Sequence, residues 1–219
     1  MNNIILQHWT GELDELAKLS SANIKKYADK VGAEYRLLRG DVFRPSLAPQ
    51  CQKLFMLDES LDEYDNVVML DMDMFTRKGM QQNIFEVEGC GLHENMQWGL
   101  CKKLRYLYPH LGNRKYSYWG GAVYKLDREM RQRLRQHIRE DEIIQFNDQF
   151  HDEGIMHRLA VLEKIKGHYF ADDRWSFSFG ENTERVAIIH LRPRRLIDGN
   201  KVLVGKVPHY HYLVDKGLI

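Results

Sequence analysis

The chain has 219 residues, of which 43% are hydrophobic and 29% charged, and this fits a globular protein with one sizeable core. Its 32 Lys and Arg residues almost balance its 31 Asp and Glu residues, so the overall charge excludes neither sign of ligand and indicates no nucleic-acid or membrane partner. The apolar runs are too short to span a bilayer, the N-terminus has no signal-peptide pattern and the three cysteines form no CxxC pair, so we expect a cytoplasmic location with reduced thiols.

Residues 1–75 alternate between strand-like and helix-like patterns. The expected elements are, in chain order, a strand at Ile4–Leu6, a helix that opens at Thr10 or Gly11 and stops at Val31–Gly32, a strand at Glu34–Leu38, a helix at about Gln50–Tyr64 and a strand at Val67–Leu70. This alternation is typical of an α/β fold. We therefore predict a central, mostly parallel sheet flanked by helices.

Residues 76–219 are less regular. The expected elements are loops over Gly89–Trp119, a turn at Trp119–Ala122 that leads into a strand through Tyr124, a helix at Asp127–Asp141, a helix at Glu153–Lys164 and a buried strand at Arg185–His190. The helix at Asp127–Asp141 is rich in arginine, which predicts a solvated face. We expect the whole chain, residues 1–219, to form one domain.

The strand at Val67–Leu70 runs directly into Asp71-Met72-Asp73. Residues i and i+2 of a strand point to the same face, so the two carboxylates would repel each other unless positive charge or water compensates. His190 ends another apolar run, and ligands of open α/β sheets bind beyond the carboxyl ends of the strands. If these ends meet, Asp71, Asp73 and His190 form a divalent-metal site, where the imidazole favours Mn²⁺ over Mg²⁺. The competing interpretation is a plain strand end and a hydrogen-bonded surface histidine.

The segment LDEYDNVVMLDMDMF, residues 61–75, resembles the region around the DxD motif of GT-A-fold glycosyltransferases. The resemblance is greatest to glycogenin-like and galactosyltransferase-like enzymes of family 8. It implies one Rossmann-like GT-A domain, with a nucleotide-binding half at 1–75 and a half for donor sugar and acceptor at 76–219. It also implies transfer of a hexosyl unit from a UDP-sugar, by default UDP-glucose, to a glycan or glycoprotein acceptor, with Mn²⁺ or Mg²⁺ as the cofactor.

The resemblance also assigns roles to residues outside the acidic pair. Lys53 stands where similar enzymes place a basic residue that touches the donor, and Gly120-Gly121 resembles a turn that lines the donor-sugar pocket. A carboxylate beside the sugar would stabilise positive charge at the anomeric carbon. Segment 147–153 resembles the acidic segment there, which makes Asp152 and Glu153 the catalytic candidates, although acids also suit a helix start.

Four further residues are candidates for contacts with the nucleotide. His8 or Trp9 would contact the base, although a Trp after a buried strand is more often part of the core. Arg192 or Lys206 would bind the diphosphate, since the family's late Gly-x-x-Lys-Pro-Trp segment is only echoed around these two residues. The chain is also similar to the first domain of large chlorella-virus glycosyltransferases, which would make it viral, active in the host cytoplasm and part of a longer multi-domain chain.

Two other classes of function compete with glycosyl transfer. An apolar strand followed by DxD and then Thr76 resembles the nucleophile motif of haloacid-dehalogenase-like phosphatases. Against this, Phe75 stands where that motif has Thr or Val, two strands precede it, and the later Gly-Asp-x-x-x-Asp motif is absent. The other alternative is a non-catalytic module that binds nucleotide sugars.

Overall fold

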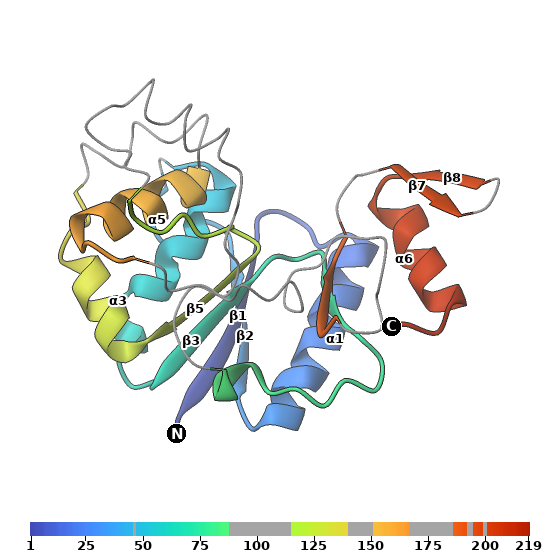
Figure 1. Cartoon of the computed structure of the whole chain (residues 1–219), viewed down its shortest axis with the longest axis horizontal. Coiled ribbons are helices and arrows are strands. Elements are labelled where there is room, and N and C mark those ends of the chain that lie inside the picture. The colour runs from blue at the N-terminus through green and yellow to red at the C-terminus, as the bar shows by residue number, and fades with distance from the viewer. Residues whose placement is uncertain (46, 88–114, 140–150, 167–185, 192–194, 199–200) are drawn as a thin grey trace.

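The computed structural model describes residues 1–45, 47–87, 115–139, 151–166, 186–191, 195–198 and 201–219. Its centre is a four-stranded sheet in the order β2-β1-β3-β5 (Figure 1). The strands are β1 (Asn3–Trp9), β2 (Glu34–Arg39), β3 (Asn66–Leu70) and β5 (Val123–Asp127). β1 is parallel to both β2 and β3, whereas β5 is antiparallel to β3. The predicted α/β fold with a mostly parallel sheet is confirmed.

Helices cover both faces of this sheet, because apolar side chains of the inner strands point to both sides. Alternate residues of β1, such as Ile4 and Ile5, are both fully buried but belong to different core clusters. One cluster is covered by η1 (Pro49–Leu57), α3 (Arg128–Arg135) and α5 (His151–Leu162), and the other by α1 (Glu15–Val31) (Figure 1). The helices therefore cover the faces of the sheet and not the ends of its strands.

The first helix begins later than the sequence pattern predicts. Asp14 is its N-cap, and the Asp14 carboxylate accepts a hydrogen bond from the backbone N–H of Ala17 at 2.7 Å. Capping by this side chain moves the start from Thr10 or Gly11 to Glu15. The predicted stop is confirmed: Gly32 has a φ of 68° and its N–H bonds the last carbonyls. Residues 10–14 are therefore a loop that follows β1.

The predicted helix at Gln50–Tyr64 is wrong as a single α-helix. The chain forms two 3₁₀ helices, η1 and η2 (Glu59–Leu61), separated by Asp58 in an extended conformation. Asp58 stops the first helix and caps the second, since its carboxylate accepts from the N–H of Ser60 at 2.9 Å.

The predicted solvated face of the arginine-rich helix is wrong for Arg131. This side chain is fully buried, and its guanidinium donates to the carbonyls of Leu61 and Tyr64, at 3.0 and 2.6 Å. The helix, α3, also ends at Arg135, several residues before the predicted end. Arg131 therefore ties α3 to the chain segment that leads into β3.

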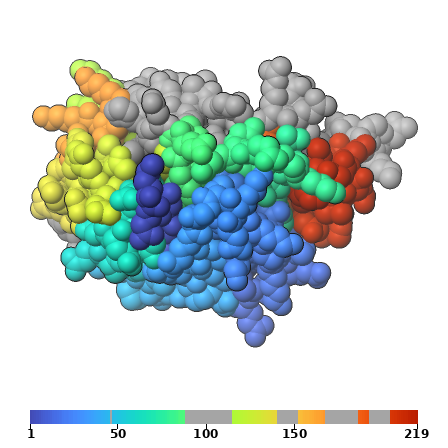
Figure 2. All heavy atoms as spheres, turned by 90° about the horizontal axis from the view of Figure 1, so that it is seen from below, coloured from blue at the N-terminus to red at the C-terminus, as the bar shows by residue number. Residues whose placement is uncertain are grey.

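Smaller elements complete the described chain. They are a two-stranded antiparallel sheet of β4 (Met74–Thr76) and β6 (Ile188–His190), the short η3 (Ile84–Glu86), a hairpin of β7 (Arg195–Asp198) and β8 (Lys201–Val204), and the C-terminal α6 (Lys206–Asp215). Figures 1 and 2 both place α6 and α3 at opposite ends of the molecule. None of the helices in the described part of the chain is long and apolar enough to cross a membrane. Most of the loops predicted over 89–119 lie outside the described residues.

Candidate active site

The carboxyl end of β3 and the small β4–β6 sheet bring the predicted metal ligands together. Asp71 and Asp73 lie in the three-residue connection from β3 to β4, and His190 is paired with Met74 across the antiparallel β4–β6 ladder. The N–H of Leu191 donates to the carbonyl of Asp73 at 2.9 Å, which fixes the two segments against each other. His190 therefore reaches the acidic pair through the antiparallel β4–β6 sheet and not from a strand of the central sheet.

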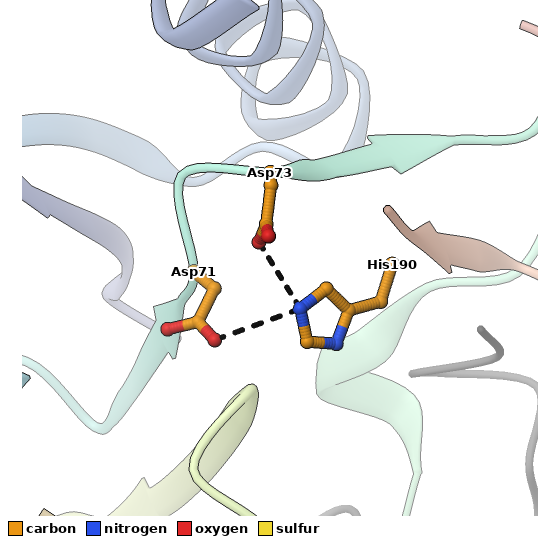
Figure 3. Close-up of side chains that lie close together, drawn as sticks. All are labelled: Asp71, Asp73 and His190. Atoms are coloured by element: carbon orange, nitrogen blue, oxygen red, sulfur yellow. Dashed lines mark ion pairs between the residues drawn. The ribbon is translucent and has the colours of Figure 1, made fainter. Parts of the chain in front are cut away.

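The geometry of Asp71, Asp73 and His190 fits a divalent cation. Nε2 of His190 lies 3.1 Å from Oδ1 of Asp73 and 3.8 Å from Oδ2 of Asp71 (Figure 3). One ligand atom from each residue lies within 4.8 Å of the other two. Neighbouring ligands of an octahedral ion with bonds near 2.1 Å are about 3 Å apart, so small side-chain adjustments suffice. The carboxylate oxygens are ligands of the type that Mg²⁺, Ca²⁺ and Mn²⁺ take, and the imidazole nitrogen is a ligand of transition-metal ions.

Two lysines take the carboxylate oxygens that face away from His190. Nζ of Lys53 lies 2.8 Å from Oδ1 of Asp71, and Nζ of Lys206 lies 2.7 Å from Oδ2 of Asp73. Burial opposes ionisation of Asp73, but the hydrogen bond to His190 and the charges of His190 and Lys206 outweigh it and lower the pKa of Asp73 to about 2. Positive side chains therefore compensate the two adjacent negative charges.

Lys53 also connects Asp71 to a second, more deeply buried carboxylate. Its ammonium lies 2.9 Å from Oδ2 of Asp152 and donates to the carbonyl of Gly121 at 2.8 Å. Burial disfavours the charge on Lys53, but the carboxylates of Asp152 and Asp71 outweigh this effect and raise its pKa. An ammonium has three N–H donors, and these three contacts use all of them. Lys53 thus holds the two carboxylates and the glycine turn in one network.

Glu153 contacts the turn that precedes β5, and Asp152 contacts β5 itself. Oδ2 of Asp152 accepts from the hydroxyl of Tyr124 at 3.1 Å, and Oε1 of Glu153 accepts from the N–H of Gly121 at 2.9 Å. Tyr118 also donates to Glu153, at 3.2 Å. Burial is the largest influence on both acids and raises the pKa of each. Neighbouring residues of a helix usually diverge, yet here both carboxylates reach groups at the start of β5: Asp152 is buried and bonds Tyr124, whereas Glu153 is partly exposed and bonds Gly121.

Asp71, Asp73 and Lys53 also line a cleft of about 560 Å³. His8 and Trp9, at the end of β1, line it, and both rings are anchored: Nε2 of His8 lies 2.7 Å from the carbonyl of Gly40, and the indole of Trp9 donates to the carbonyl of Glu12 at 2.8 Å. Burial lowers the pKa of His8, which favours the neutral ring. The other residues that line the cleft are Thr10, Asp14, Leu16, Ala17, Pro49, Gln50, Lys53, Leu70, Asp71, Met72, Asp73 and Lys206.

Most residues singled out from the sequence therefore meet in one region. His8, Trp9, Lys53 and Lys206 line the cleft with the acidic pair, and Gly120 precedes the turn beside Asp152 and Glu153. Arg192 and segment 147–150 lie outside the described residues. The sequence interpretation missed the hydroxyl of Tyr124, whose position in a buried strand is a usable signal, because a buried tyrosine hydroxyl needs a partner.

Comparison with solved structures places this arrangement in a known fold. No protein-family model matches the chain, and no curated protein matches it in sequence. The galactosyltransferase LgtC, solved with donor and acceptor sugar analogues, aligns with a TM-score of 0.53 and 14% identity, over 85% of this chain and 86% of LgtC. A glycosyltransferase involved in glycosylation of the major capsid of PBCV-1 gives 0.54 and 10% identity, over 87% of this chain and 93% of that one.

A third similar structure is the bifunctional glycosyltransferase WbbM, with a TM-score of 0.55 and 12% identity. The alignment covers 86% of this chain but only 45% of WbbM. At these identities the comparisons establish the fold and not the reaction. The α/β architecture of this chain, with its mixed, mostly parallel sheet, is thus the GT-A fold of these glycosyltransferases.

Proposed function

We propose that the protein is a Mn²⁺-dependent glycosyltransferase that moves a hexosyl unit from a UDP-sugar, such as UDP-glucose, to a glycan or glycoprotein acceptor. The observation that carries this proposal is the group Asp71, Asp73 and His190, whose two acids line the cleft at the carboxyl end of β3. The glycosyltransferase fold of the neighbours supports it. Mg²⁺ is the alternative ion, with the imidazole ligand favouring Mn²⁺.

The cleft offers a different kind of contact to each part of the donor. The anchored rings of His8 and Trp9 provide flat, partly apolar surfaces for the base. Lys206, which is about half-exposed, is free to shift its ammonium from Asp73 to a diphosphate oxygen. A bound divalent cation would neutralise the diphosphate and make it a better leaving group.

We place the donor sugar beside Asp152, which Lys53 connects to Asp71. Asp152 is held by Lys53 and Tyr124, so its carboxylate is fixed in place before any substrate arrives. In our proposal Asp152 stabilises the positive charge at the anomeric carbon or acts as base toward the acceptor hydroxyl. Glu153 orients the turn that begins at Gly121 through the N–H of Gly121. Lys53 positions Asp71 and Asp152, since its donors are all used within the protein.

Thermal-shift screening tests this proposal. UDP and UDP-hexoses are expected to raise the melting temperature in Mn²⁺ but not in EDTA, because a ligand that binds only the native state stabilises it. Asp73→Asn is expected to abolish the shift. Asp65→Asn is the matched control, since Asp65 directly precedes the opposite end of β3 and pairs with Arg128. Stabilisation by phosphate or BeF₃⁻ instead of UDP would favour a phosphatase and contradict the proposal.

A further inference from the structure

Gln7 lies in an inner strand of the central sheet, next to the start of the acidic segment Asp71-Met72-Asp73. It belongs to β1 and is paired with Leu70, the last residue of β3. Its side chain is fully buried, and its amide nitrogen donates to the carbonyl of Asp71 at 2.9 Å and to Oγ of Ser20 at 3.1 Å. Its oxygen accepts from the hydroxyl of Tyr35 at 2.9 Å. A carbonyl can only accept, so the contact with Asp71 fixes which end of the carboxamide faces residues 71–73. We call these three residues, which connect β3 to β4, the acidic connection.

Ser20 continues this contact from α1 to the start of β4. It is fully buried, and its hydroxyl, which accepts from Gln7, donates to the carbonyl of Met74 at 2.8 Å. Gln7 and Ser20 therefore form a relay of side-chain hydrogen bonds that joins the carbonyls of Asp71 and Met74. We call this pair the Gln7–Ser20 relay. Each donor in the relay has an acceptor, which is the condition for a buried polar network to hold one geometry.

The relay spans the connection that carries both carboxylates. Asp71 directly follows Leu70, the last residue of β3 that pairs with β1, and Met74 is the first residue of β4 that pairs with β6. The carbonyls at these two ends are the ones that the relay binds. Breaking it would leave a buried acceptor without a partner and let the connection move. The separations of 3.1 and 3.8 Å between His190 and the two acids depend on that connection.

We propose that Gln7 and Ser20 are positioning residues for the metal site, acting through the backbone of the acidic connection. This inference rests on the proposed function, because it takes Asp71, Asp73 and His190 as ligands of Mn²⁺. The relay touches neither the ion nor the donor. It sets the spacing of the ligands before the ion binds. Residues that hydrogen-bond to metal-ligating residues typically contribute 10–100-fold to metal affinity.

Mn²⁺ binding, measured by electron paramagnetic resonance of the free ion, tests the relay without any substrate. Ser20→Ala removes the hydroxyl donor to Met74, and Gln7→Met removes both amide donors, to Asp71 and to Ser20. Each replacement is apolar and similar in size to, or smaller than, the side chain that it replaces. Each is expected to weaken Mn²⁺ binding by roughly tenfold at a temperature well below unfolding. Tyr27→Phe is the matched control, because the buried Tyr27 hydroxyl on the same helix accepts from Ile84 at 2.9 Å, away from the acidic connection.

The outcomes separate the two proposals. Weaker Mn²⁺ binding in Ser20→Ala, with wild-type binding in Tyr27→Phe, supports the relay, and this comparison holds even if Gln7→Met does not fold. Equal binding in the wild type and Ser20→Ala overturns the relay and leaves the metal site in place. An equal loss in Ser20→Ala and Tyr27→Phe also overturns it, because a general loss of stability then explains both. A wild-type protein that binds no Mn²⁺ overturns the proposed function and the relay together.

Discussion

A Cβ atom added to Gly121 would lie 2.5 Å from Oδ2 of Asp152, so the turn before β5 has no room for a side chain beside this carboxylate. Gly121→Ala is therefore expected to push Asp152 away from Lys53 and Tyr124, which share the same oxygen. Because Asp152 is assigned to the sugar and not to the nucleotide, the variant is expected to bind UDP normally and UDP-hexose more weakly. Isothermal titration of both ligands in Mn²⁺ checks this difference.

Gly32→Ala is the matched control for Gly121→Ala. Gly32 has a φ of +68° and open space around its Cβ position, so alanine there costs about 1 kcal/mol of unfolding free energy through backbone strain alone. It is expected to lower the melting temperature without changing the affinity for UDP-hexose. Wild-type affinity for UDP-hexose in Gly121→Ala would show that the turn lies outside the sugar pocket.

Lys53→Met tests whether the buried ammonium holds the two carboxylates together. Methionine fills similar space but leaves Asp71 and Asp152 without their cation, and breaking a buried ion pair in this way costs on the order of 3–5 kcal/mol. The free energy of unfolding, from urea titration, is expected to fall by that amount. Adding Asp152→Asn to Lys53→Met is expected to restore part of it, because one uncompensated charge is removed.

Lys206→Met provides the comparison for that experiment. Lys206 also pairs with an acid of the site, but 43% of its side chain is exposed, and such pairs contribute less than about 1 kcal/mol. It is expected to leave the free energy of unfolding almost unchanged while weakening UDP binding.

The double variant Lys53→Met with Asp152→Asn gives the result that would contradict the network. If its loss of unfolding free energy equals the sum of the losses in the two single variants, the two residues do not interact, since the effects of directly interacting residues are not additive.

Asp152→Asn and Glu153→Gln distinguish the roles of the two neighbouring acids of α5. Asp152→Asn is expected to lower kcat by roughly a hundredfold, with UDP affinity unchanged, because a charge stabiliser or general base acts in the transition state. Glu153→Gln keeps an oxygen that can accept from the N–H of Gly121, so its effect is expected to be smaller. Steady-state kinetics with a UDP-sugar compares the two variants, and a reversed ranking would make Glu153 the catalytic carboxylate.

The sequence predicted the parts of the fold that follow from local patterns. The apolar runs at Ile4–Leu6 and Val67–Leu70 and the stop at Gly32 are where the structure has them, because burial and backbone conformation are local properties. The start of α1 and the break at Asp58 depended on which acid caps a helix, and several acids compete for that role. The burial of Arg131 depended on the distant carbonyls of Leu61 and Tyr64, which no local pattern reveals.

The candidate site was predictable in membership but not in arrangement. The acidic pair and His190 each follow an apolar run, so their meeting at one edge was expected from the sequence. That Lys53 has all its donors bound within the protein depends on contacts with Gly121 and Asp152, 68 and 99 residues away in the chain. The hydrogen bonds of the Gln7–Ser20 relay could not be predicted either, because they join residues far apart in the chain. From the sequence alone, Gln7 resembles an ordinary polar residue at the end of a strand.

UDP binding in the presence and absence of a metal ion tests the central claim most directly. Isothermal titration of the wild type and Asp73→Asn, each in Mn²⁺ and in EDTA, isolates the contribution of the site formed by Asp71, Asp73 and His190. We predict that the wild type binds UDP more than about tenfold more tightly in Mn²⁺ than in EDTA, and that Asp73→Asn binds weakly under both conditions. Equal UDP affinity of the wild type in Mn²⁺ and in EDTA would contradict a metal-dependent donor site.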